Sequence, residues 1–351
     1  MKNFIKVLSA LFSTTLAINC IFSISLLSTN AASLNEKQSE FEYAEKAVST
    51  YLQSYKVNND EIYISDSLDV YDIKSGLDTN DLYVVFNKDE VIGLLSVAYI
   101  NDSYYSSFEY NNFESLQTIY NKKEEFNFVC NEEKLYINTS DITYSIDNVS
   151  EVVDCDFELA TTEIIEKTHR LDTLDSSPTY MYRKNLYVPI VPNENINNGI
   201  CWAAAIASKQ NYLNNDTLLA HDVLNTLQST YGGSPIGNTY WIEKGFQHYN
   251  IPCTTIYRMM NCVEVYNNIE NNNPIYMSVT CQEGGHALLL SGLTINSDDS
   301  GIYRVVDSNR MAYVDIMVPA NTMVSNSSTE GNFTYVASYG YTFTHWRRSH
   351  Y

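Results

Sequence analysis

The chain has 351 residues and a net charge of −21, and 44% of its residues are hydrophobic. Two domains with separate cores fit in this length, and the hydrophobic content argues against global disorder. The charge is uneven, because residues 33–190 carry 30 acidic and 12 basic side chains, whereas residues 191–351 carry 12 and 7. This pattern predicts two modules with different roles. It also excludes nucleic acid as an expected partner, since no basic patch is present.

Residues 1–32 have the pattern of a signal peptide. Lys2 and Lys6 precede an uncharged stretch over residues 7–27, and small residues follow where a signal peptidase cuts. An uncleaved membrane anchor is the alternative, because an uncharged stretch of this length can just span a bilayer. The Ser, Thr and Asn residues within it favour cleavage. We therefore expect a secreted protein, extracellular or associated with the cell surface, without a membrane segment after cleavage.

The next segment, residues 33–166, contains most of the acidic excess and is called the acidic module below. Apolar residues at helical spacing predict a helix from Phe41 to Leu52, and alternating segments after it predict β-strands. The stretch "FNKDEVIG" places turn residues between two such strands and predicts a hairpin. We expect a small α+β module here, with no cluster of side chains that suggests chemistry.

Residues 167–187 are predicted to be an exposed linker. Ser176, Ser177 and Pro178 interrupt the periodicity, and basic residues on both sides offer sites to proteases.

Residues 188–351 form the second predicted module, called the C-terminal module below. Helix patterns come first, over 201–213, 218–232 and 239–250, and from Ile251 onward the patterns are mainly those of strands. Helices followed by an antiparallel sheet give an α+β fold class.

The cysteines are too sparse for a disulfide-held scaffold, and no CxxC pair suggests a zinc site. Cys253 could pair with Cys262, and Cys130 with Cys155, and buried free thiols fit the spacing equally well. We expect no metal and no other cofactor.

Cys201 begins the helix pattern "CWAAAIASKQNYL", directly after "NNG", so Asn198 or Gly199 is the expected cap of this helix. Unpaired N–H groups at a helix start favour an anion, and a cysteine thiolate is such an anion. A buried structural thiol is the alternative reading of this feature alone.

His286 and Asp307 are predicted to be neighbours. His286 follows Gly284 and Gly285, which we expect to leave room for a close backbone approach, and it starts the strand "HALLLSGL". Asp307 ends the next strand, and the short polar connection predicts an antiparallel pair. Asp307 would then orient the imidazole, with Asn309 as the alternative.

From about Val188 onward, the pieces "VPNENINNGICWAA", "GGHALLLSGL" and "YRVVDS" resemble the papain-like cysteine peptidases, especially the secreted bacterial branch with streptopain, staphopain and C39-like domains. The resemblance implies a papain-like domain with Cys201 as nucleophile, His286 as base and acid, and Asp307 as the orienting carboxylate. It implies proteins or peptides as substrates. The acidic module would be a propeptide, an intramolecular inhibitor of a zymogen.

The family places a Gln six residues before the nucleophile as an oxyanion donor, and this sequence has Asn195 there. Asn193 is the alternative in another register. Three functions stay open: a cysteine endopeptidase, which we favour; an acyltransferase with the same triad; and a catalytically degenerate binding or surface protein.

Overall fold

The computed structural model describes residues 39–55, 57, 61–131, 134–140, 142–146, 148–153, 163–171, 180–194, 199–281, 284–298, 300–319 and 333–351. The chain divides into two compact units, residues 1–46 and 47–351. In the first unit, the described residues 39–46 are helical. The expected signal peptide, Ser176 to Pro178 of the linker, and Asn195 lie outside the described residues. No helix within the described ranges is long and apolar enough to cross a membrane.

The second unit starts with helical residues 47–55 and continues into a strongly twisted set of strands. The hairpin predicted at "FNKDEVIG" is confirmed, with its turn at Lys88, where φ is +56°. The strands and the helix of this part are β1 (Ile62–Ile64), β2 (Leu68–Asp72), β3 (Leu77–Asn87), β4 (Glu90–Ile100), β5 (Ser103–Tyr110), α2 (Glu114–Lys122), β6 (Phe126–Asn131), β7 (Lys134–Thr139), β8 (Thr143–Ser145) and β9 (Asn148–Val153).

The remainder of the unit has helices first and strands afterwards, so the predicted α+β class is confirmed at the level of a mixed fold with a largely antiparallel sheet. Its elements are β10 (His169–Arg170), β11 (Tyr180–Asn185), α3 (Cys201–Asn214), α4 (Ala220–Tyr231), α5 (Thr239–His248), β12 (Thr255–Ile256), α6 (Cys262–Glu270), β13 (Ile275–Thr280), β14 (Gly285–Asn296), β15 (Gly301–Asp307), β16 (Ala312–Val318), β17 (Tyr335–Val336), β18 (Thr342–Phe343) and β19 (His345–His350).

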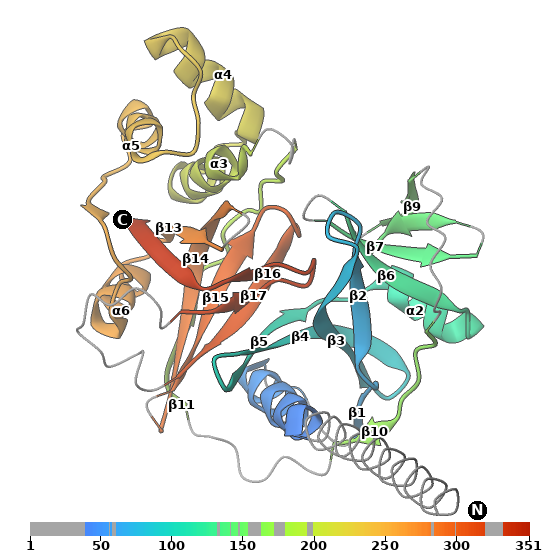
Figure 1. Ribbon diagram of the computed structural model, residues 1–351. Coiled ribbons are helices and arrows are strands. Elements are labelled where there is room, and N and C mark those ends of the chain that lie inside the picture. The colour runs from blue at the N-terminus through green and yellow to red at the C-terminus, as the bar shows by residue number, and fades with distance from the viewer. Residues whose placement is uncertain are drawn as a thin grey trace, which may run out of the picture. The chain divides into compact units, whose positions relative to one another are not determined.

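Helix α3 is almost entirely buried, because it packs on β14 and against α4 and α5 (Figure 1). Its small side chains, among them Ala203 and Ala207, allow these close contacts. A Cβ atom at Gly245 of α5 would lie 2.7 Å from Ile206, so glycine is needed where α5 approaches α3. This packing fixes the start of α3 relative to the sheet.

The central strand of the C-terminal module is β14, which pairs antiparallel with β13, β11 and β15. β15 pairs with β16, and β16 pairs in turn with β5, with Val314 opposite Glu109 (Figure 1). One hydrogen-bonded sheet therefore runs from the acidic module into the C-terminal module.

Candidate active site

Cys201 is the first residue of α3, as the helix pattern predicted. Gly199 adopts a left-handed conformation with φ of +59° and turns the chain into the helix. The cap position is Ile200 rather than Asn198 or Gly199, and no side chain caps the helix. The expected capping is therefore wrong, and the Cys201 side chain lies at the helix start, where the helix dipole favours an anion.

His286 lies near the start of β14, one strand away from Asp307 at the end of β15. The register places Asp307 opposite Leu288, so the two side chains meet diagonally across the pair. His286 Nε2 lies 2.9 Å from Asp307 Oδ1, and both side chains are fully buried. The adjacency predicted from the two strands is confirmed.

The glycines before His286 are not packed closely against the described chain. A Cβ atom at Gly284 would have no neighbour within 4 Å, and one at Gly285 would make only ordinary contacts, the shortest at 3.5 Å to the Val279 carbonyl oxygen. The space at these glycines is open, and their role in a close backbone approach to the imidazole stays a prediction.

Asp307 is held by four hydrogen bonds. Its Oδ1 accepts from His286 and from the backbone N–H of Asn309, at 2.8 Å. Its Oδ2 accepts from the hydroxyls of Tyr335, at 2.7 Å, and Tyr339, at 3.1 Å. Burial alone raises the pKa of a carboxyl group, but here His286 and these donors outweigh burial and lower the pKa of Asp307 to about 2.

The charged form of His286 is favoured by its surroundings. Burial lowers the pKa of the imidazole, but the Asp307 carboxylate raises it by more, and Cys201 adds to the effect, so the pKa lies well above its ordinary value. Its second ring nitrogen, Nδ1, is buried and makes no hydrogen bond in the described structure. Nδ1 is therefore the atom left for Cys201.

Aromatic rings shield this pair from water. Phe343 of β18 packs on the imidazole with ring centroids 5.6 Å apart, and Tyr335 stacks on Phe343 at 5.8 Å. Trp346 does not take part in this stack and packs against Tyr303 and Phe333. These rings and tyrosine hydroxyls were not found by sequence reasoning, and an aromatic-rich C-terminal stretch was their only signal.

A second cysteine–histidine pair provides an internal comparison. Cys253 Sγ lies 3.8 Å from His350 Nδ1, and Cys253 is a free thiol, so it forms no bridge to Cys262. Loss of solvation raises the pKa of Cys253, while burial, Arg348 and Lys209 lower the pKa of His350 to about 4. These shifts favour two neutral groups. Of these two pairs, the one with Cys201 is the pair whose imidazole, His286, has surroundings that favour its charged form.

The other predicted residues have different positions. The Asn193 side chain donates to Asn309 Oδ1 at 2.8 Å, so its amide is directed to that turn. Asn309 reaches Asp307 through its backbone and not through its side chain, so it does not replace Asp307 beside His286. No group of three or more His, Cys, Asp or Glu side chains within the described ranges is arranged to hold a metal ion.

Comparisons with known proteins name no family. No protein-family model matches the chain, and no curated protein matches it. Among solved structures, a protein described as a C39-like peptidase from Bacillus anthracis matches with a TM-score of 0.27 and 12% identity, over 39% of this chain and 98% of that one. A TM-score this low does not establish a shared fold, so the functional argument rests on the site.

Proposed function

We propose that this protein is a secreted cysteine peptidase that hydrolyses peptide bonds with Cys201, His286 and Asp307. The observation that carries the proposal is the buried His286–Asp307 pair, together with the effect of Cys201, which lies at a helix start and adds to the raised pKa of His286. Nucleophile, base and orienting group are the parts that covalent acyl transfer requires.

The geometry assigns a role to each atom. Asp307 accepts a hydrogen bond from the Nε2–H group and fixes the ring, so that Nδ1 takes the thiol proton from Cys201. Cys201 Sγ attacks the carbonyl carbon, and the Nδ1 proton then passes to the leaving amine as the peptide bond breaks. Water attacks the resulting thioester while Nδ1 accepts its proton. The acid product leaves and the thiol is restored.

Stabilisation of the oxyanion rests on the start of α3. The Cys201 backbone N–H supplies one donor, and the favourable end of the helix dipole lies at the same place. We propose Asn195 as the second donor. An Asn195→Ala variant should then lower kcat by roughly 10²–10³-fold.

The proposal includes export and processing. Residues 1–32 would be removed on secretion, and a cut within residues 167–187 would convert the zymogen. The acidic module as an inhibitor of the cleft stays a prediction. It is tested by following activity together with chain mass in the protein lacking residues 1–32, since inhibition predicts that activity rises as the chain is cut.

The test of the peptidase function uses two cysteine variants. Wild type, Cys201→Ala and Cys253→Ala, all lacking residues 1–32, are held in mild reductant with and without a trace of added protease. Labelling by an epoxide thiol reagent and cleavage of a mixed peptide library are followed by mass spectrometry. Cys253→Ala is the matched control, because it removes the other cysteine that lies beside a histidine.

We expect wild type and Cys253→Ala to be labelled once and to cleave peptides, and Cys201→Ala to do neither. Added amines would be incorporated into products if the chain were an acyltransferase. Absence of labelling and cleavage in wild type, before and after the cut, would show that the peptidase proposal is wrong and favour a binding protein.

A further inference from the structure

The pairing that joins the two modules lies next to the residues that hold Asp307. β5 pairs with β16, and β16 pairs with β15, whose last residue is Asp307. Residues 308–311 form the turn between β15 and β16. The backbone N–H of Asn309 in this turn donates to Asp307. A single turn therefore connects Asp307 to β16, the strand that pairs with the acidic module.

A buried ion pair connects the acidic module to that turn. Arg310 donates through Nε to Glu109 Oε1 at 3.2 Å and through Nη2 to Oε2 at 3.0 Å, and the two side chains are only 1% and 3% exposed. Removing one member of a buried pair costs about 3–5 kcal/mol, because the other charge is left uncompensated. Arg310 therefore depends on Glu109 for its buried position.

The same glutamate also holds the second support of Asp307. Ser338 donates to Glu109 Oε1 at 2.7 Å, and Ser338 lies in the β17–β18 hairpin, directly before Tyr339. Tyr335 and Tyr339 of this hairpin are the two hydroxyl donors to Asp307. One carboxylate of the acidic module thus contacts both segments that position the catalytic carboxylate.

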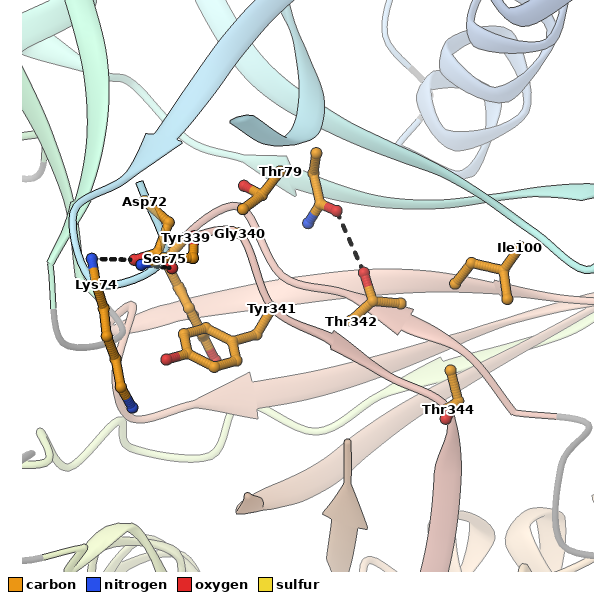
Figure 2. Close-up of a pocket in the computed structure, with 11 residues that line it drawn as sticks. Asp72, Lys74, Ser75, Thr79, Ile100, Tyr339, Gly340, Tyr341, Thr342 and Thr344 are labelled. Atoms are coloured by element: carbon orange, nitrogen blue, oxygen red, sulfur yellow. Dashed lines mark hydrogen bonds between the residues drawn. The ribbon is translucent and has the colours of Figure 1, made fainter. Parts of the chain in front are cut away.

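Two further side chains of the acidic module fasten the hairpin. Asn80 donates to the Ala337 carbonyl at 3.0 Å and lies 3.3 Å from the Thr342 hydroxyl, and Ser107 donates to the Val336 carbonyl. A Cβ atom at Gly340, where φ is +89°, would lie 2.6 Å from the Thr79 hydroxyl, so glycine allows this close approach. Figure 2 shows Thr79 of β3 beside Gly340 of the hairpin, and both residues line a pocket of about 590 Å³.

We propose that the acidic module is a permanent part of the catalytic centre, in which Glu109 positions Asp307 through Arg310 and Ser338, and that the module stays bound after the linker is cut. The inference rests on the proposed peptidase function. Glu109 is a positioning residue, because it touches none of the reacting atoms. A cut in the linker would leave two associated chains, so the acidic module would not act as a propeptide that leaves the cleft.

The first test compares Glu109→Gln with Asp315→Asn. Asp315 is the matched residue, because it forms a buried ion pair with Arg304 at 2.9 Å and also lies in the pairing of β5 with β16. Its ion pair involves neither Arg310 nor Ser338. Both variants are assayed where their unfolding curves show folded protein. We expect kcat to fall roughly 10–100-fold in Glu109→Gln and to stay within about threefold in Asp315→Asn.

The pH profile separates positioning from a general loss of stability. Asp307 raises the pKa of His286, so loosening Asp307 should move the alkaline limb of kcat/KM to lower pH in Glu109→Gln only. The inference would be overturned if Glu109→Gln kept the kcat of wild type and the same alkaline limb of kcat/KM. It would also be overturned if Asp315→Asn lost as much kcat as Glu109→Gln.

The second test cuts the full chain at an inserted protease site between Ser176 and Ser177 and analyses the product by size exclusion without denaturant. Co-elution of both fragments with activity supports the inference, and separation of the acidic module overturns it. If wild type shows neither activity nor labelling of Cys201, both before and after the cut, the proposed function is refuted instead. That result is distinguishable, because co-elution is measured independently of activity.

Discussion

A buried lysine on α3, the helix that begins at Cys201, gives the sharpest quantitative prediction. Lys209 of α3 is 0% exposed, and its Nζ makes no hydrogen bond in the described structure. Its nearest aromatic partner is Phe246, whose ring centroid lies 5.4 Å from Nζ. Burial lowers the pKa of Lys209 to about 7, so folding removes a proton that the unfolded chain keeps up to about pH 10.4.

The sign and size of the effect follow from proton linkage. Between pH 7 and about 10.4 the unfolded chain binds more protons at this lysine than the folded chain does, so stability rises with pH over this range. With a folded pKa of about 7, the contribution of Lys209 to the free energy of unfolding rises by about 2 kcal/mol from pH 7 to pH 9. His350, on which Lys209 also acts, has a pKa of about 4 and is neutral throughout.

We expect Lys209→Met to stabilise the protein by about 2–4 kcal/mol at pH 7, and the gain over wild type to shrink by about 2 kcal/mol at pH 9. Urea unfolding followed by tryptophan fluorescence measures both values. Lys122→Met is the control, because this side chain is 64% exposed and should change stability by less than about 0.5 kcal/mol. A gain for Lys209→Met that is the same at both pH values would refute the reasoning.

Three further predictions concern the proposed catalytic centre. Asp307→Ala should lower kcat by roughly 10²–10⁴-fold, because His286 loses the acceptor that orients its ring and stabilises its charged form, and pre-steady-state acylation assays would show whether the chemical step is lost. The same variant should move the alkaline limb of kcat/KM towards pH 6.5, since the raised pKa of His286 depends on Asp307, and a pH–rate profile measures this shift. Tyr335→Phe should lower kcat by about tenfold and more than Tyr339→Phe, because its hydroxyl lies closer to Asp307, at 2.7 rather than 3.1 Å, and parallel kinetics of the two variants compare them.

The sequence is enough to predict the elements around the site. Two strands joined by a short polar turn must pair antiparallel, so Asp307 could be placed beside His286 before any coordinates were known. The helix after Cys201 follows from a run of strong helix formers. In both cases a local pattern determines the answer.

Contacts between distant segments could not be predicted. Tyr335 and Tyr339 lie 28 and 32 residues from Asp307, and Glu109 lies 201 residues from Arg310. Nothing in the periodicity of one segment specifies which buried carboxylate its hydroxyl groups will meet. The cap of α3 was mispredicted for a different reason. The chain turns at Gly199, so the cap position is Ile200, which has no polar side chain to cap the helix before Cys201.

The strand pairing between β5 and β16 also bears on how the protein avoids aggregation. β16 has the sequence "AYVDIMV", most of its side chains are buried, and on the side away from β15 its partner is β5. Without β5, its backbone N–H and C=O groups would form an open, apolar sheet edge, which is a template for pairing with another chain. β5 of the acidic module thus covers a sheet edge that would otherwise be open to pairing with another chain.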